Sequence, residues 1–298
     1  MRKVILIAGV ACLMAAIGAS SAVASPSTWQ RFEAKVIGKA GTAKKPGSVG
    51  SYLHPFHIIK QDASCATAAN SAACRTNTFG PASVAGGALE EPPFATMQAY
   101  IYFPKEMKLA TAGFPTCELA TAVADPKTCP KGSVIGGGVA AGYARNATAG
   151  VGQYTLRPNL TVDVVILSPT QLGLRTYNPL TGKGLITGDI GKATGAAAKK
   201  YGTKITFSIP KGLINPSGIL MSQLSSFDST IKAVKNKKGK PLQALTGCPK
   251  NKKLTFGYNG IYNVMLDRDT QPTFTAGDLT LSINHVGPIV TSTVPCKK

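Results

Sequence analysis

The sequence contains few of the side chains from which enzymes build catalytic sites. Three histidines and 13 acidic residues occur among 298 positions, so a Ser-His-Asp site, a histidine zinc site or a carboxylate pair has few candidate members. The patterns G-x-S-x-G and H-E-x-x-H are absent. The composition therefore favours a non-enzymatic protein without a cofactor. The alternative is a hydrolase whose site is assembled from scattered residues.

Arginine is also rare, and tryptophan occurs once. Arginine supplies the forked contacts that suit bases and phosphates, and aromatic side chains supply the platforms on which bases stack. The basic segments of this chain consist of lysine interleaved with glycine and alanine. The sequence therefore predicts no specific nucleic-acid partner.

Long apolar runs are missing except at the N-terminus. There, Arg2 and Lys3 precede an apolar stretch, and Ala22-Val23-Ala24 follows it as an A-x-A cleavage site. This order is typical of a secretory signal peptide, and the stretch is shorter than the ~20 residues that span a bilayer. We expect residues 1–24 to be removed, and residues 25–298 to form one exported β domain or two packed β subdomains without a transmembrane span.

The cysteines that follow the signal peptide are six, an even number for an oxidising compartment, which predicts three disulfides. Several connectivities are open, and we expect neighbours in the sequence to pair. On the loop-entropy model the two short loops would each contribute roughly 3 kcal/mol and the long loop about 4 kcal/mol. The expected pairs are Cys65 with Cys74, Cys117 with Cys129, and Cys248 with Cys296.

Short runs rich in Val, Ile, Thr, Tyr and Phe, separated by glycine and proline, predict strands throughout the chain. Residues 204–209 alternate strictly, which places Ile205, Phe207 and Ile209 on one buried face. Residues 163–167 are apolar after their aspartate, as in a central strand covered on both sides. We expect an all-β fold, an antiparallel β-sandwich with few short helices, stapled by disulfides. The clearest expected strands are residues 97–103, 160–167, 203–209, 253–258 and 279–284.

Basic residues outnumber acidic residues by 33 to 13, a net charge of +20 that falls to +18 when the two basic residues of the signal peptide leave. Lysines gather in residues 39–45, 192–204 and 232–240, which we expect to be exposed loops or hairpin tips. Such lysines attract polyanions and give salt-sensitive binding, although the charge could also serve solubility alone. We expect a secreted or cell-surface protein that binds anionic cell-envelope polymers through Lys235, Lys237, Lys238 and Lys240.

Two patterns match known motifs without the context that those motifs need. Gly136-Gly137-Gly138 begins a G-x-G-x-x-A match, but no βαβ alternation surrounds it, so we interpret it as a strand in close backbone contact with a neighbour. Ser208 with Lys211, and Ser229 with Lys232, match the S-x-x-K of serine acyl-enzymes, whose companion S-D-N and K-T-G elements are missing. We assign no nucleophile.

Candidate metal ligands are scattered in the same way. His54 and His57 lie three residues apart with Asp62 nearby, but strand alternation would point the two imidazoles to opposite faces. His285 has no candidate partner close in the sequence. Asp267-Arg268-Asp269 could hold calcium if loop carbonyls joined it, and a solvated turn is the simpler interpretation. No metal site is predicted.

The residues around the second cysteine pair form a distinctive motif. They read FPTC at residues 114–117 and, after a short spacer, CPKGSVIGGG at residues 129–138. They resemble the pattern P-x-C…A-C-P-x-G-S-x-I-G-x-G of a large set of uncharacterised secreted β-rich proteins of actinobacteria. Thr128 stands where alanine is usual in that pattern. The resemblance implies an exported β-rich protein with a Cys117–Cys129 disulfide, and it implies no activity.

Overall fold

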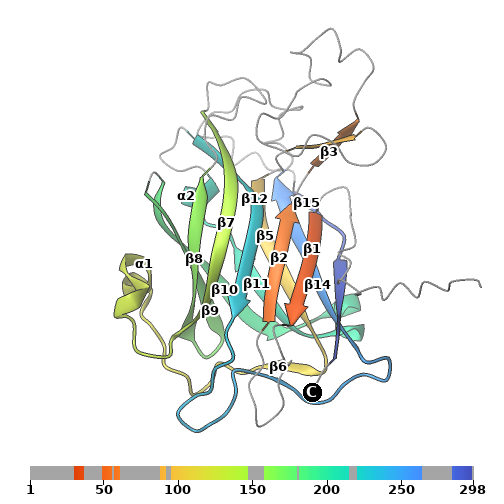
Figure 1. Cartoon of the computed structure of the whole chain (residues 1–298). Helices are drawn as coiled ribbons and strands as arrows, with labels where there is room; N and C mark the ends of the chain where they lie inside the picture. Colours follow the sequence, from red (N-terminus) through yellow and green to blue (C-terminus); the bar gives the residue numbers. More distant parts are fainter. Residues whose placement is uncertain are drawn as a thin grey trace, which may run out of the picture.

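The computed structural model describes residues 30–36, 49–55, 57–60, 88–91, 95–146, 158–179, 181–214, 220–263 and 284–296. Within these ranges antiparallel strands dominate and the helices are short (Figure 1). The expected all-β, antiparallel, disulfide-stapled fold with few short helices is confirmed. The elements are β1 (Gln30–Val36), β2 (Val49–Pro55), β3 (His57–Lys60), β4 (Ala88–Glu91), β5 (Ala95–Pro104), β6 (Met107–Leu109), α1 (Leu119–Ala124), the 3-10 helix η3 (Pro126–Thr128), β7 (Val134–Asn146), β8 (Asn159–Ser168), β9 (Gln171–Asn178), β10 (Gly182–Lys192), the 3-10 helix η4 (Gly195–Lys199), β11 (Tyr201–Ser208), α2 (Lys211–Ile214), β12 (Leu220–Ile231), β13 (Gln243–Leu245), β14 (Lys253–Asn263), β15 (Asn284–Val286) and β16 (Val290–Pro295).

One twelve-stranded antiparallel sheet forms the body of the protein, in the order β1-β2-β12-β7-β8-β9-β10-β11-β5-β14-β15, with β16 paired to β14. The sheet curls so that its first strand, β1, lies against β14 and β16. The Ala34 N–H donates to the Ser292 hydroxyl of β16 at 3.0 Å, and the Phe32 ring stacks on Tyr258 of β14 with centroids 5.8 Å apart. The two halves of the sheet therefore face each other as the layers of a sandwich, and β12 contacts β5 across the interior.

The expected strands at residues 97–103, 160–167, 203–209 and 253–258 correspond to β5, β8, β11 and the first part of β14. The fifth, residues 279–284, lies outside the described residues apart from Asn284. On β11, Ile205 and Phe207 are buried as the alternation predicted. On β8, Val165 is buried against Cys117, Ala122 and Cys129 on the outer side of the sheet. This strand is covered on both sides, as its continuous apolar run indicated.

The glycine run forms part of β7, where the backbone of β12 comes very close. A Cβ placed on Gly136 would lie 2.0 Å from the carbonyl oxygen of Thr230, and one on Gly138 would lie 1.9 Å from that of Asp228. Side chains larger than hydrogen do not fit there. The interpretation of this run as a strand in close backbone contact is confirmed.

Two of the three expected disulfides are present, Cys117–Cys129 and Cys248–Cys296. Cys65 and Cys74 lie outside the described residues. The first disulfide closes the loop that carries α1 and η3. Both ends of this loop form backbone hydrogen bonds with Ile166 of β8. The Cys117 N–H donates to the Ile166 carbonyl at 2.9 Å, and the Ile166 N–H donates to the Ser133 carbonyl at 2.8 Å. The cysteine motif therefore docks a loop on the sheet.

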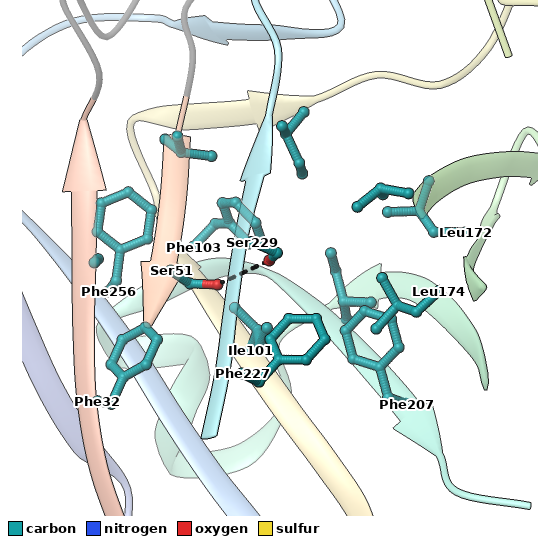
Figure 2. Close-up of a pocket in the computed structure, with 15 residues that line it drawn as sticks. Phe32, Ser51, Ile101, Phe103, Leu172, Leu174, Phe207, Phe227, Ser229 and Phe256 are labelled. Atoms are coloured by element: carbon teal, nitrogen blue, oxygen red, sulfur yellow. Dashed lines mark hydrogen bonds between the residues drawn. The ribbon is translucent and has the colours of Figure 1, made fainter. Parts of the chain in front are cut away.

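Large side chains fill the half of the interior next to β6 and β13, which we refer to as the packed half. Its members include Phe103, Met107, Leu242, Leu254 and Phe256. The half beneath α2, the α2 half, has smaller residues at the inward positions, among them Ala99, Ala140, Gly142 and Gly184. Between the two halves lies a cavity of about 50 Å³, in which the hydroxyls of Ser51 and Ser229 are 3.4 Å apart (Figure 2).

Candidate functional site

The four lysines that the sequence analysis assigned to polyanions lie on one tight loop between β12 and β13. Their side chains are exposed, and an isolated antiparallel bridge joins Lys235 to Pro241 at the base of the loop. The loop turns at Gly239, whose φ of +73° suits glycine. The structure therefore places all four lysines on one surface feature. They are Lys235, Lys237, Lys238 and Lys240.

Asn236 gives this loop a fixed shape. Its side chain is buried, and its Oδ1 accepts hydrogen bonds from the N–H groups of Lys238 and Lys240, both at 3.0 Å. Its Nδ2 donates to the carbonyl oxygen of Ala112 at 3.4 Å, which ties the loop to the segment after β6. The backbone that carries the lysines therefore has a defined shape before any partner binds.

Six more exposed lysines belong to the same end of the molecule. β6 pairs with β13, the Ala110 N–H donates to the Leu242 carbonyl, and the Thr246 N–H donates to the Glu106 carbonyl, both at 2.7 Å. The Cys248–Cys296 disulfide holds the next segment to β16. Together with the four loop lysines these six define a region that we refer to as the lysine end. The six are Lys105, Lys108, Lys232, Lys250, Lys252 and Lys253.

The lysine end has little negative charge to offset its ten lysines. In its described segments, 105–109, 232–245 and 247–253, Glu106 is the one acidic residue. The salt bridges between described residues are Lys35 with Asp228 and Arg175 with Asp163, and neither involves a lysine of this end. This surface therefore carries a concentrated positive charge without carboxylate partners among the described residues.

The sequence predicted that the second lysine-rich segment, residues 192–204, is an exposed loop with little strand structure. The structure differs from this prediction. Lys192 ends β10, Lys204 lies within β11, and η4 lies between the two strands. The ammonium groups of Lys200 and Lys204 lie 5.7 and 5.1 Å from the ring centroids of Tyr201 and Tyr100. Aromatic packing against the sheet therefore orders this connection. The third segment, residues 39–45, lies outside the described residues.

The candidate catalytic and metal-binding residues of the sequence analysis do not come together in a site among the described side chains. Ser208 is exposed at the end of β11. Ser229 lines the interior beside Ser51, whereas Lys232 is exposed, so this S-x-x-K pair is not brought together. Elsewhere in the described ranges no group of three His, Cys, Asp or Glu side chains could hold a metal. Outside the described side chains are His54, His57, Asp62, Asp267-Arg268-Asp269 and His285.

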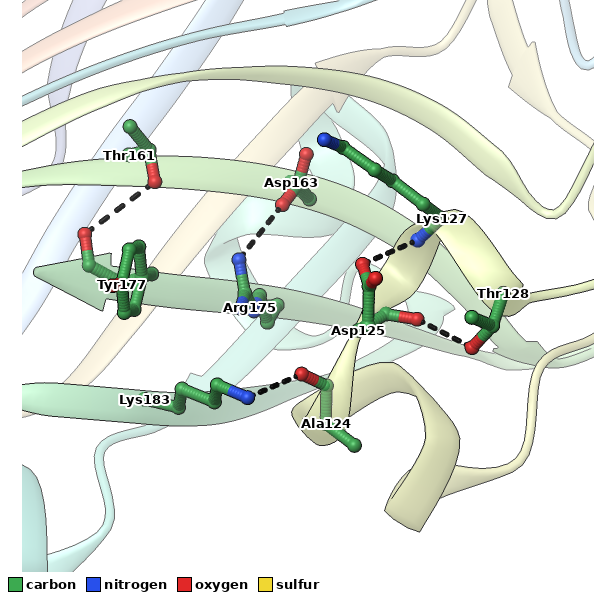
Figure 3. A network of polar contacts seen from close by, with 9 residues as sticks. All are labelled: Ala124, Asp125, Lys127, Thr128, Thr161, Asp163, Arg175, Tyr177 and Lys183. Carbon is green, nitrogen blue, oxygen red and sulfur yellow. Dashed lines mark hydrogen bonds and ion pairs between the residues drawn. The ribbon is translucent and has the colours of Figure 1, made fainter.

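A polar network covers the outer face of β8, β9 and β10, where α1 and η3 dock (Figure 3). The guanidinium of Arg175 is 3.4 Å from the Asp163 carboxylate and 5.1 Å from the centroid of the Tyr177 ring. The ammonium of Lys183 donates to the Ala124 carbonyl at the end of α1 at 2.6 Å. The Lys183 contact joins the disulfide loop to β10, and the Arg175 ion pair joins β9 to β8, so the network has a structural role.

The sequence analysis did not anticipate a cavity of about 190 Å³ in the α2 half. Its walls come from nine strands and from α2, and they are mostly aliphatic. Two threonines in its lining, Thr96 and Thr176, are buried, and their hydroxyls have no hydrogen-bond partner. The one signal in the sequence was the small residues at alternate positions of β7, Ala140, Gly142 and Ala144, which leave space on the inner face.

Comparisons of the chain with protein-family models, with curated proteins and with solved structures find no match. Among the described residues, no helix is long and apolar enough to cross a membrane. The two disulfides fit a protein that folds in an oxidising compartment outside the cytoplasm.

Proposed function

We propose that this is a non-enzymatic exported protein that binds anionic cell-envelope polymers through the lysine end. The observation that supports the proposal is the gathering of ten exposed lysines from three chain segments on one end, with Glu106 as their one acidic neighbour among the described residues. Each lysine that meets a phosphate releases condensed counterions, so the affinity of such a surface is strong at low salt and falls as salt rises.

The geometry of the loop strengthens this proposal. Asn236 fixes the backbone from residue 236 to residue 240, so a polymer does not have to order the loop when it binds. The spread of lysines over several segments suits an extended, repetitive partner better than a compact ion. Export is inferred from the signal-peptide pattern of residues 1–24 and from the disulfides.

The test replaces Lys235, Lys237, Lys238 and Lys240 with glutamine and measures binding to immobilised polyphosphate and to a purified phosphate-rich wall polymer. These side chains are exposed, so the fold should be retained. We expect weaker binding and a shallower dependence of log affinity on log salt concentration, because fewer counterions are released.

A matched pair of double variants separates position from total charge. Lys237→Gln with Lys238→Gln removes two charges from the lysine end, and Lys127→Gln with Lys211→Gln removes two exposed charges from elsewhere. The first pair should weaken binding more than the second. Equal effects would leave only non-specific attraction by the net charge, and no binding of either polymer by the parent protein at low salt would overturn the proposal.

A further inference from the structure

The cavity in the α2 half has a mainly apolar wall. Aliphatic and aromatic side chains from opposite sides of the sandwich converge on it, and α2 adds Leu213 and Ile214 from the end. Gly184 of β10 leaves the space that Leu213 occupies, since a Cβ on this glycine would lie 2.4 Å from the Leu213 side chain. Four residues line both this cavity and the smaller one shown in Figure 2: Ile101, Leu174, Phe207 and Phe227.

Thr96 reaches the cavity because of a bulge in β5. Gln98 lies opposite Ile261 of β14, but Thr96 lies opposite Tyr262, so Met97 has no partner on β14 and the alternation of the strand shifts by one residue. Residues directly opposite on antiparallel strands share a face, and Tyr262 is buried with its hydroxyl 3.2 Å from that of Tyr258. The bulge therefore turns a hydroxyl inward where an apolar side chain would continue the pattern.

Thr176 reaches the cavity from the other layer. It continues the inward series of β9 after Leu172 and Leu174, and its Oγ1 would lie 2.9 Å from a Cβ on the facing Gly184. Thr96 and Thr176 are each 5% exposed, and neither hydroxyl has a partner in the described structure. A buried hydroxyl without a partner is unfavourable, because it has lost its hydrogen bonds to water. The Oε1 of the buried Gln223, also in the lining, has no hydrogen-bond partner either. Three such groups in the lining of one cavity point to a ligand that hydrogen-bonds to them.

The size and charge of the cavity limit what this ligand can be. An apolar protein cavity of about 150 Å³ accommodates benzene, so about 190 Å³ suits a ring with a short alkyl substituent. The one charged residue in the lining, Lys183, directs its ammonium to the Ala124 carbonyl on the outer face. A carboxylate or ammonium on the ligand would be buried without a counter-charge, which is strongly unfavourable.

We propose that the α2 half binds one neutral, mainly hydrocarbon molecule of about ten non-hydrogen atoms that carries a hydroxyl or carbonyl group. Its hydrocarbon body fills the cavity, and its polar group hydrogen-bonds to Thr96 or Thr176. This site is independent of the lysine end, because the two lie at opposite ends of the strands: β5 carries Thr96 near its start and leads into Lys105 after its last residue. The protein would thus hold a small molecule while its other end contacts the envelope.

The test titrates the purified, oxidised protein by calorimetry with three probes that share a propylphenyl body: para-propylphenol, propylbenzene and para-propylbenzoate. We expect saturable one-to-one binding of the phenol and the hydrocarbon, and at least tenfold weaker binding of the benzoate. Replacing both threonines with valine should weaken the phenol about tenfold and leave the hydrocarbon unchanged or tighter, because two hydroxyls without partners are removed. Thr293→Val, at an exposed threonine of β16, is the matched control and should change neither.

Two variants that fill the cavity, Ala140→Leu and Ala99→Ile, test the location of binding. Each adds carbon atoms to a buried alanine in the lining, and each should abolish binding of the phenol while the circular dichroism spectrum remains that of the parent. Two variants are used so that one remains informative if the other does not fold. Four results would each overturn the proposal. Two are that the parent binds neither the phenol nor the hydrocarbon, and that a folded filled variant binds the phenol as tightly as the parent. The other two are tight binding of the benzoate and an unchanged affinity of the valine variant for the phenol.

Discussion

The packed half and the α2 half of the interior are built on the same strands, yet one is filled and the other is hollow. β5 presents Phe103 to the packed half and Ala99 to the α2 half, and β7 presents Ile135 to the first and Gly142 to the second. The sheet supplies the same backbone at both levels. The difference therefore lies in the size of the inward side chains, and it shows that a strand can contribute to a stable core and to a cavity within ten residues.

The two ends also differ in how they are closed. Beyond the packed half, β6 pairs with β13 and the Cys248–Cys296 disulfide joins the last segments. Beyond the α2 half, the described closure is the four-residue α2. The close packing and the disulfide stabilise the end next to the packed half. The α2 half can therefore keep an unfilled cavity and hydroxyls without hydrogen-bond partners, as the cavities that bind ligands often do.

The largest expected effect comes from truncating a large side chain in the packed half. Phe103 is buried and packs edge-to-face on Phe256 with ring centroids 5.8 Å apart. Phe103→Ala should lower the free energy of unfolding by about 3–5 kcal/mol. Ile186→Ala, beside the existing cavity of the α2 half, should cost about 2 kcal/mol, because fewer contacts are lost.

Urea unfolding followed by circular dichroism checks both variants against the parent protein. An equal loss for the two substitutions, after allowance for the larger size of phenylalanine, would show that both halves are equally well packed. That result would contradict the contrast between them.

We expect a smaller change in the free energy of unfolding when the side chain is enlarged at two positions of β7, Gly136 and Ala140. Gly136→Ala places a Cβ 2.0 Å from the carbonyl oxygen of Thr230, so the backbones of β7 and β12 must separate. We expect a loss of about 1–3 kcal/mol. Ala140→Leu buries three more carbon atoms in the cavity and should stabilise the protein by about 1 kcal/mol after the entropy of the longer side chain is deducted.

Thermal unfolding of the two variants tests this difference in sign. Destabilisation by both would mean that the α2 half has no room for additional atoms. That result would contradict the unfilled volume on which the contrast between the two halves rests.

Much of the fold follows from local patterns. The alternation of residues 204–209 predicted the buried face of β11, the apolar run of residues 163–167 predicted a strand covered on both sides, and the glycine run predicted a close strand pair. Neighbouring cysteines paired as expected where the structure describes them, at Cys117–Cys129 and Cys248–Cys296. These features depend on residues close in the sequence or on the size of a single side chain.

The curling of the sheet and both candidate sites depend on contacts between distant segments. The lysine loop was recognised from its composition. Five of the six lysines that join it come from residues 105–108 and 250–253, which the pairing of β6 with β13 and the second disulfide bring near. Thr96 points inward because of a bulge, and period-two reasoning assigns the opposite face. A single sequence carries no local signal for such a shift.

Tyrosine ionisation tests whether the α2 half is dry. Tyr258 lines the cavity and is fully buried beside the Tyr262 hydroxyl. Burial raises the pKa of Tyr258 and that of Tyr262 well above the ordinary value of 10.0. On the outer side of the sheet, burial and then the neighbouring Tyr102 raise the pKa of Tyr201 to about 12.

The sign of the pH dependence follows from these shifts. Below pH ~10 both the folded and the unfolded chains keep their tyrosine protons, so the stabilisation is complete. Above that pH the unfolded chain loses protons that the folded chain retains, and the free energy of unfolding falls by about 1.4 kcal/mol per pH unit for each retained proton. Stability is therefore lost as the pH rises from about 10 toward 12.

Tyr258→Phe should make this loss less steep than in the parent protein by about one proton, because one buried phenol is removed. Urea unfolding at several pH values above ~9 gives the slopes, and tyrosinate absorbance reports ionisation of the folded protein directly. A water-filled cavity would solvate the phenolate of Tyr258 and let it ionise at its ordinary pH in the folded state. The parent protein and the Tyr258→Phe variant would then have the same slope, and the apolar character that favours a neutral hydrocarbon ligand would be contradicted.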